Sequence, residues 1–284
     1  MFIRSEYMKS AIIFGATDTG KRIYHDIKNE YNIIGFVDGN PKLVGQECEG
    51  FIIRDCQSLN YNEYDYIIIG VLTRYSEIKE EIINMGIPEY KIIGKYVEIA
   101  VQSRIEFLKN IGDIINKNNI GGSVAELGVY QGEFAKCINK VFSDRKLYLF
   151  DTFAGLPQYD AEYDNNKGFA TANQGHFSNT SEQIVLNKMK YSDNCIICKG
   201  YFPETTKGID DTFCFVNLDA DLYKPTLDGL QFFYPKMKKN GVILIHDYFS
   251  SAFKGVRYAV DQFTSENNIK FLPIGDTLSV AIIK

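Results

Sequence analysis

Acidic side chains and one histidine stand where apolar runs of the sequence end, in the second half of the chain. These residues are Glu126, Asp151, Asp219, His246 and Asp247. If the apolar runs are neighbouring parallel strands, their carboxyl ends meet at one edge of a sheet, which is where open α/β sheets bind ligands. Because carboxylates that lose their water need partners, this clustering predicts a ligand site at that edge.

Glycines follow the first of these acids. Glu126 begins the pattern Glu-Leu-Gly-x-x-x-Gly, whose glycines, Gly128 and Gly132, let the backbone approach a ligand closely. Asp151 lies 23 residues after Gly128, where an acid can accept hydrogen bonds from ribose hydroxyls. The turn itself holds no basic residue to meet a pyrophosphate, which favours a nucleoside without phosphates. The alternative is that both glycines serve packing only.

The elements that must position these residues alternate between strands and helices. Apolar runs predict strands at 124–129, 146–151, 195–200, 213–219 and 241–247, with helices at 133–142, 181–191, 225–238 and 253–267. Two further strands, 271–275 and 278–284, are joined by so short a turn that they must be antiparallel. We therefore predict an α/β fold in which a parallel sheet, covered on both faces, ends in an antiparallel hairpin.

A polar segment, 159–179, follows the predicted strand that ends in Asp151. It has almost no apolar periodicity, so we predict a long loop, and loops of this length are usually lids or disordered. Its place in the chain puts it over the site. His176 within it would contact a ligand or be solvated.

The first half of the chain predicts a smaller α/β unit. Strands are expected at 10–15, 32–38, 65–71 and 91–96, and helices at 19–30 and 76–86. We divide the chain into a small Rossmann-like domain at 1–97, a helical linker of one or two helices at 98–122, and a larger domain at 123–284. Thr17 stands where a dinucleotide-binding turn has its middle glycine, so we expect a structural or dimerising unit that does not bind NAD.

Charge and composition argue against several kinds of partner. The net charge is −5 and no basic patch stands out, so a nucleic acid is not an expected partner. No apolar run approaches the ~20 residues that span a bilayer, and the start is too polar and short for a signal peptide, so we predict a cytoplasmic protein. Homo-oligomerisation is left open.

Two cysteines form a C-x-x-C pattern, which can bind zinc or carry redox chemistry. Cys195 and Cys198 lie within one predicted strand. Residues three apart on a strand point to opposite faces, so the two thiols would not share an ion. We therefore interpret them as packing residues.

The order of several uncommon motifs resembles that of macrocin-type O-methyltransferases, over about residues 105–284. The motifs are VAELGVYQGEFA, LFDTFAGLP, GHFSNTSEQIV, KGYFPETT, FVNLDADLYKPT and ILIHDYF. The resemblance implies a class I methyltransferase fold, S-adenosylmethionine as methyl donor and a sugar hydroxyl as acceptor. The cofactor-binding positions that it implies are Glu126, Gly128, Gly132 and Asp151, and we also predict Tyr130, Thr152, Gly200 and Phe202 as cofactor-binding residues.

The resemblance also implies a divalent metal held by Asp219 and Asp247. The family often has two aspartates where this chain has His246-Asp247. Independently, a cation can favour the alkoxide of a hydroxyl acceptor, and it removes a repulsion of roughly 4 kcal/mol between two carboxylates about 4 Å apart at an effective dielectric of 20. We predict Asp219, His246 and Asp247 as ligands of a divalent cation, with Mg²⁺ as the first candidate.

Two roles are open for the histidine, and two functions for the chain. We predict Asp219 and His246 as catalytic residues, with His246 a third ligand or a base; the alternative is a core histidine satisfied by hydrogen bonds. The predicted function is metal-assisted, S-adenosylmethionine-dependent O-methylation of a sugar, nucleotide sugar or glycosylated small molecule. The alternative is a nucleotide-sugar-binding or assembly module with a vestigial methyltransferase half.

Overall fold

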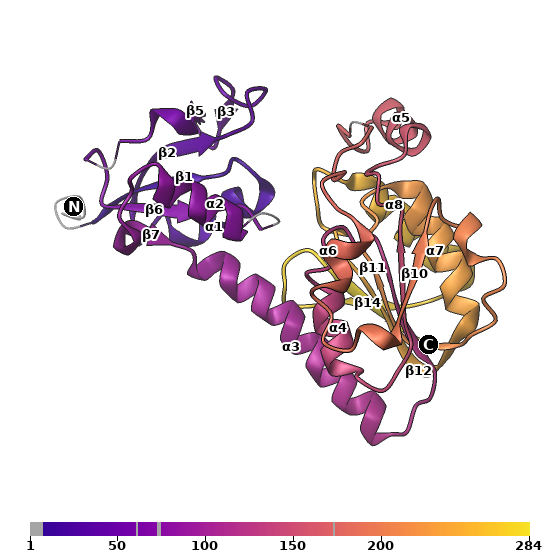
Figure 1. Cartoon of the computed structure of the whole chain (residues 1–284). Coiled ribbons are helices and arrows are strands. Elements are labelled where there is room, and N and C mark those ends of the chain that lie inside the picture. The colour runs from indigo at the N-terminus through magenta and orange to yellow at the C-terminus, as the bar shows by residue number, and fades with distance from the viewer. Residues whose placement is uncertain (1–7, 61, 73–74, 173) are drawn as a thin grey trace. The chain divides into compact units, whose positions relative to one another are not determined.

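Two units with separate sheets make up the chain. The computed structural model describes residues 8–60, 62–72, 75–172 and 174–284 (Figure 1). The units are Met1–Gln102 and Ser103–Lys284, and their boundary falls inside one continuous helix, α3 (Lys95–Lys117). The predicted linker is thus a single helix rather than two. The predicted domain limits themselves stay a prediction.

A parallel sheet forms the N-terminal unit, in the order β5-β2-β1-β6-β7. Its strands are β1 (Ser10–Phe14), β2 (Asn32–Asp38), β5 (Arg54–Asp55), β6 (Tyr66–Ile69) and β7 (Ile92–Ile93). The helices are α1 (Asp18–Ile27), α2 (Tyr75–Asn84) and the short 3₁₀ turns Cys56–Ser58 and Glu89–Lys91, and a small hairpin joins β3 (Glu47–Cys48) to β4 (Phe51–Ile52). The predicted strand 91–96 is wrong beyond two residues, because the chain enters α3 at Lys95.

The glycine turn after β1 is closed by its own side chains. Thr17 caps α1: its hydroxyl accepts a hydrogen bond from the Gly20 N–H at 3.1 Å and donates to the Gly70 carbonyl at 2.6 Å. A Cβ atom at Gly20 would lie 2.0 Å from the Gly15 carbonyl oxygen, so the backbones pack tightly here. That this unit does not bind NAD stays a prediction.

A seven-stranded sheet forms the second unit, in the order β10-β9-β8-β11-β12-β14-β13. Its strands are β8 (Ser123–Leu127), β9 (Leu147–Asp151), β10 (Cys195–Lys199), β11 (Phe213–Leu218), β12 (Met237–Ile245), β13 (Phe271–Pro273) and β14 (Val280–Ile283). The first five strands of this order are parallel, and β14 is antiparallel to both β12 and β13. The predicted fold class is confirmed.

Helices cover both faces of this sheet, as the unalternating strands predict. They are α4 (Ala135–Val141), α5 (Gln158–Lys167), α6 (Glu182–Leu186), α7 (Tyr223–Lys236) and α8 (Lys254–Asn267), with 3₁₀ turns at Ser192–Asn194 and Glu204–Thr206. All six residues of β11 are buried. One core packs under α7 and α8 and the other under α3, α4 and α6 (Figure 1).

The two cysteines of the C-x-x-C pattern face different cores. Cys198 packs with the α7–α8 core and Cys195 with the α3–α4 core, and both thiols are free. The strand geometry that argued against a shared ion is confirmed. Among the described residues, no helix has the length and apolar character needed to cross a membrane.

The expectation of a loop over 159–179 is wrong in its first part, which is helix α5. This helix starts after Pro157 and ends at Gly168, whose φ of +68° is left-handed. The side that it buries carries two acids, Asp160 and Asp164. A helix that buries carboxylates has no apolar stripe, which is why the sequence pattern did not reveal it.

Candidate active site

Gly128 lies where the turn after β8 touches the chain after β11. Its φ is +85°, and a Cβ atom at this position would lie 1.9 Å from the backbone oxygen of Asp219. Only glycine allows this approach. The packing alternative therefore explains the residue type at Gly128, and it places Asp219 directly beside the turn. Cofactor roles for Gly128 and Gly132 stay predictions.

Asp151 holds this turn together. Its Oδ2 atom accepts hydrogen bonds from the backbone N–H groups of Val129 and Tyr130, both at 2.8 Å, and its Oδ1 atom accepts one from Phe153 at 2.7 Å. A carboxylate has roughly four lone-pair sites, so three are used by the backbone. About one site remains for a ribose hydroxyl.

Replacing Asp151 with asparagine should weaken S-adenosylmethionine binding at least about tenfold, since a hydrogen bond to a charged group contributes about 1.5–3 kcal/mol. The side-chain NH₂ group of asparagine cannot accept the hydrogen bonds that backbone N–H groups of the turn donate to Asp151. Calorimetric titration measures this. The matched control is Asp38→Asn, because Asp38 accepts from Ala16 in the N-terminal unit at 2.9 Å. The control should keep full affinity, and unchanged affinity in Asp151→Asn would remove that residue from the site.

The end of the polar segment reaches the turn. The Tyr130 hydroxyl donates to the Asn179 side chain at 2.8 Å, and the Gln131 side chain donates to the Asn179 carbonyl at 2.9 Å. The Thr180 hydroxyl donates to the Tyr130 carbonyl. His176 is exposed and stacks on Phe177 with ring centroids 4.1 Å apart. Tyr130 therefore joins the predicted cofactor turn to the segment.

The remaining predicted cofactor residues lie around the ends of β9 and β10. Thr152 lines a cavity of about 460 Å³ together with Tyr201 and residues of 154–157 and 174–178. Gly200 has a φ of +137° and donates to the Asp151 carbonyl at 2.9 Å. The Phe202 side chain instead packs in the core against Phe150. Their cofactor roles stay predictions.

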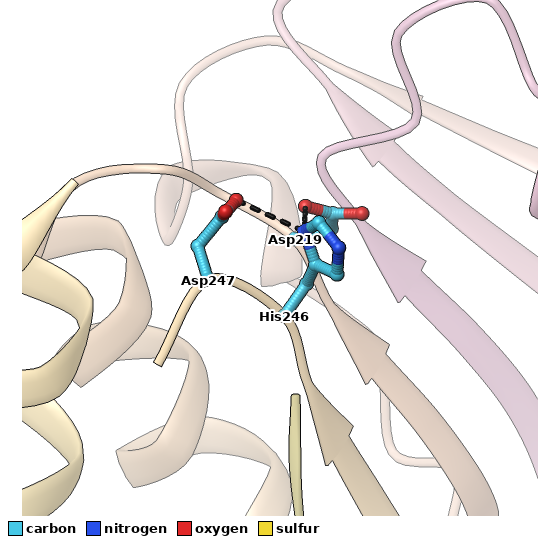
Figure 2. Close-up of side chains that lie close together, drawn as sticks. All are labelled: Asp219, His246 and Asp247. Carbon is cyan, nitrogen blue, oxygen red and sulfur yellow. Dashed lines mark hydrogen bonds and ion pairs between the residues drawn. The ribbon is translucent and has the colours of Figure 1, made fainter. Parts of the chain in front are cut away.

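The parallel pairing of β11 with β12 brings Asp219, His246 and Asp247 together (Figure 2). The His246 Nδ1 atom lies 3.2 Å from Asp219 Oδ1 and 2.9 Å from Asp247 Oδ2. One ligand atom from each residue lies within 4.8 Å of the others. Two carboxylate oxygens and an imidazole nitrogen are donors that suit a divalent cation.

The charges of this cluster depend on one another. Burial and the nearby Arg104 charge oppose the charged imidazole, but Asp219 and Asp247 outweigh them and raise the pKa of His246 to about 10. Burial pushes the pKa of Asp219 upward, but His246 and Arg104 outweigh it and hold that pKa far below its usual value. The imidazolium thus supplies the positive charge between two carboxylates, the place that a cation would take.

Arg104 is a site residue that sequence reasoning missed. Its Nη2 atom donates to Asp219 Oδ2 at 3.0 Å and to Asn217 Oδ1 at 2.9 Å, and its guanidinium lies 4.2 Å from the centre of the Phe134 ring. The residue belongs to α3 and lies within the range 98–122 that the sequence predicts to be a helical linker. A single arginine on a helix has no distinguishing pattern, so only the packing of α3 reveals it.

Asn217 continues this network to Glu126. Its side-chain N–H donates to Glu126 Oε1 at 2.8 Å, and both residues are buried. The other oxygen, Glu126 Oε2, is buried without a partner. Burial first, and the Asp219 charge second, raise the pKa of Glu126 to about 8. A cationic ligand group beside Oε2 would favour the ionised form of Glu126, and S-adenosylmethionine carries two cationic groups.

Asp221 is a further acidic residue beside the cluster, and no pattern in the sequence assigns it a role. Its φ is +61°, and it follows Asp219 by two residues. Burial, then the charges of Asp247 and Asp219, raise the pKa of Asp221 well above its usual value. Asp221 therefore holds its proton more readily than an ordinary aspartate, which limits its repulsion with Asp219 and Asp247.

Comparison with known proteins agrees with this geometry. Residues 95–280 match the family model of macrocin-O-methyltransferase (TylF), and residues 7–93 match a separate model, C2185-like, N-terminal. The chain is 24% identical over 177 residues to demethyldecarbamoylnovobiocin O-methyltransferase of Streptomyces niveus, covering 58% of this chain and 67% of that protein. It is 25% identical over 178 residues to 8-demethyl-8-(2,3-dimethoxy-alpha-L-rhamnosyl)-tetracenomycin-C 4'-O-methyltransferase of Streptomyces olivaceus, covering 58% and 67%.

A solved structure shares the fold of the second unit. The O-methyltransferase NovP superposes with a TM-score of 0.54 at 22% identity, covering 64% of this chain and 79% of that one. The family match extends over more than half of the chain and includes the turn, the acid cluster and Arg104. The chain therefore belongs to the macrocin-O-methyltransferase family and is a methyltransferase.

Proposed function

We propose that the protein transfers the methyl group of S-adenosylmethionine to a hydroxyl of a sugar, nucleotide sugar or glycosylated small molecule, with the help of a divalent cation. The observation that carries this proposal is the contact between Gly128 and Asp219, which joins the donor turn to the acid cluster. Two similar enzymes are named as O-methyltransferases, and one of those names specifies a rhamnosyl-bearing acceptor. A sugar hydroxyl is therefore the acceptor class that we favour.

On the donor side, the chain's own groups would bind S-adenosylmethionine and orient it. S-Adenosylmethionine, when bound, supplies a methyl group on a sulfonium, and transfer to oxygen leaves a neutral thioether. Asp151 fixes the turn through three backbone hydrogen bonds. Glu126 offers its unpaired oxygen to a cationic group of the donor. The cavity beside Thr152 and Tyr201 has room for the nucleoside end.

On the acceptor side, Asp219, His246 and Asp247 would hold the cation. A divalent cation, when bound, lowers the pKa of a hydroxyl that it contacts and fixes its orientation. Asp219 presents Oδ1 to this cluster, because its Oδ2 atom is held by Arg104. Without a cation, His246 remains the leading candidate for a base, but it lies between both acids as an imidazolium and can accept a proton only after it has lost its own.

The alternative, a binding module with a vestigial methyltransferase half, is not favoured. A vestigial site has no reason to keep a buried carboxyl group with one oxygen unpaired, because this costs stability without a ligand. Glu126 is such a group. The chain also has Gly128 in the turn and Asp151 hydrogen-bonded to that turn, and the three side chains of the acid cluster lie close together.

Methyl transfer can be tested directly with the purified protein. Incubation with S-adenosylmethionine labelled in the methyl group, and with nucleotide sugars and glycosylated small molecules as acceptors, should give labelled product with Mg²⁺ and none with excess chelator. Chromatography separates product from donor. Absence of any S-adenosylmethionine binding in calorimetry would contradict the proposal and favour the binding module.

A further inference from the structure

One nitrogen atom of Arg104 connects the two halves of the site. Nη2 donates to Asp219 Oδ2 at 3.0 Å and to Asn217 Oδ1 at 2.9 Å. Asn217 in turn donates to Glu126 Oε1 at 2.8 Å. The connection therefore runs from the acid of the acceptor side to the acid of the donor side, through groups that are buried or nearly so.

The position of the guanidinium is fixed on several sides. The Phe134 ring lies 4.2 Å from its central carbon atom, and the side chain is 13% exposed. The two carboxylate oxygens of Asp219 have different partners: Oδ2 faces Arg104, and Oδ1 lies 3.2 Å from His246. Breaking the contact with Arg104 would free the Asp219 carboxylate to rotate.

The charge of Arg104 bears on the reaction as well. In methyl transfer, an electron pair of the acceptor oxygen forms the new C–O bond, and the C–S bond breaks with its electron pair staying on sulfur. The acceptor hydroxyl loses its proton to a base or to solvent, and the positive charge of the sulfonium is removed. The Glu126 carboxyl group, ionised beside a cationic donor, would stabilise that donor more than the transition state, in which the positive charge is fading. Stabilising the ground state more than the transition state slows a reaction. The fixed positive charge of Arg104, connected to Glu126 through Asn217, reduces this effect.

We propose that Arg104 is a positioning and charge-balancing residue for both halves of the site: it holds Asp219 and, through Asn217, Glu126, and its charge keeps Glu126 from favouring the cationic donor over its neutral product. The inference rests on the proposed S-adenosylmethionine site. It assigns a role in the reaction to a residue of α3, two positions beyond the boundary between the units.

The test compares two ligands that differ in charge. S-Adenosylmethionine has a net charge of +1 near neutral pH, and its product S-adenosylhomocysteine has none. Calorimetry with each ligand gives their affinity ratio, which a merely structural change does not alter. In Arg104→Gln and Arg104→Met the ratio should shift about tenfold toward S-adenosylmethionine, the scale of one unit charge in a partly screened site, while turnover falls.

Two further variants separate charge from hydrogen bonding. Arg104→Lys keeps the charge, so its affinity ratio should stay within about twofold of the wild-type value. Asn217→Leu keeps Arg104 but breaks the connection to Glu126. It should lower the affinities for both ligands by a similar factor. Thermal unfolding identifies variants that are folded.

The possible outcomes are distinct. An unchanged ratio in folded Arg104→Gln and Arg104→Met, or an equal shift in Arg104→Lys, overturns the charge-balancing role. Wild-type protein that binds neither ligand overturns the proposed function, and this inference with it. A shift confined to the neutral variants supports the inference.

Discussion

Asp219→Asn is expected to lower kcat about a hundredfold or more, the scale of losing a positioned metal-binding or proton-transfer group. Its two oxygens face His246 and Arg104, both hydrogen-bond donors. The amide NH₂ of asparagine must therefore face one of them, whichever way it turns. S-Adenosylmethionine affinity should stay within a few-fold, since Asp219 lies on the acceptor side. Steady-state kinetics and calorimetry measure the two effects separately.

Asp210→Asn is the matched control, because the Asp210 side chain is fully exposed. It should leave kcat unchanged. His246→Ala then separates two roles: recovery of turnover with excess cation identifies His246 as a ligand, whereas recovery at higher pH identifies a base. Full wild-type activity in excess chelator would show that the proposed metal is not needed.

Gly128→Ala is expected to abolish S-adenosylmethionine binding and to destabilise the second unit by at least about 2 kcal/mol, the scale of strained backbone plus a clash. The added Cβ atom would lie 1.9 Å from the Asp219 oxygen and 2.6 Å from its carbonyl carbon, and backbone cannot move aside as a side chain can. The melting temperature should fall by roughly 4–8 °C, at about 2–4 °C per kcal/mol for a unit of this size.

Gly208→Ala isolates the clash from the backbone conformation. Gly208 has a φ of +81°, close to the +85° of Gly128, but its Cβ atom would meet nothing within 4 Å. This variant should lose only the conformational part of the stability and keep ligand binding. Equal losses in the two variants would mean that the contact with Asp219 is unimportant.

The strand ends could be predicted from the sequence because the strands of a parallel sheet that is buried on both faces consist of consecutive apolar residues. The runs before Asp151, Asp219 and His246 gave both the sheet and the edge at which their side chains gather. Parallel pairing then brings Asp219 and His246 within 3.2 Å, as expected.

Three features could not be predicted from the sequence, because they depend on packing between segments that are far apart in the chain: helix α5, the role of Arg104 and the hydrogen bonds of Asp151. Helix α5 buries Asp160 and Asp164, so it lacks the apolar stripe by which helices are recognised. Arg104 reaches Asp219, 115 residues away, only because α3 packs on the sheet. Likewise, the spacing that suggested a ribose ligand at Asp151 does not reveal that backbone N–H groups take most of its oxygen sites.

Each of the two units has an aspartate that accepts a hydrogen bond from its glycine turn. The chain therefore allows a comparison of two units that share the glycine–aspartate spacing by which nucleotide sites are often recognised. Asp38 follows Gly15, and Asp151 follows Gly128, by the same 23 residues, and each accepts a backbone N–H of the turn. The glycine–aspartate spacing is thus a device for building a strand–helix–strand unit, whether or not a nucleoside binds. The two units differ two residues before each glycine, where one has buried Ile13 and the other has Glu126 with an oxygen left unpaired.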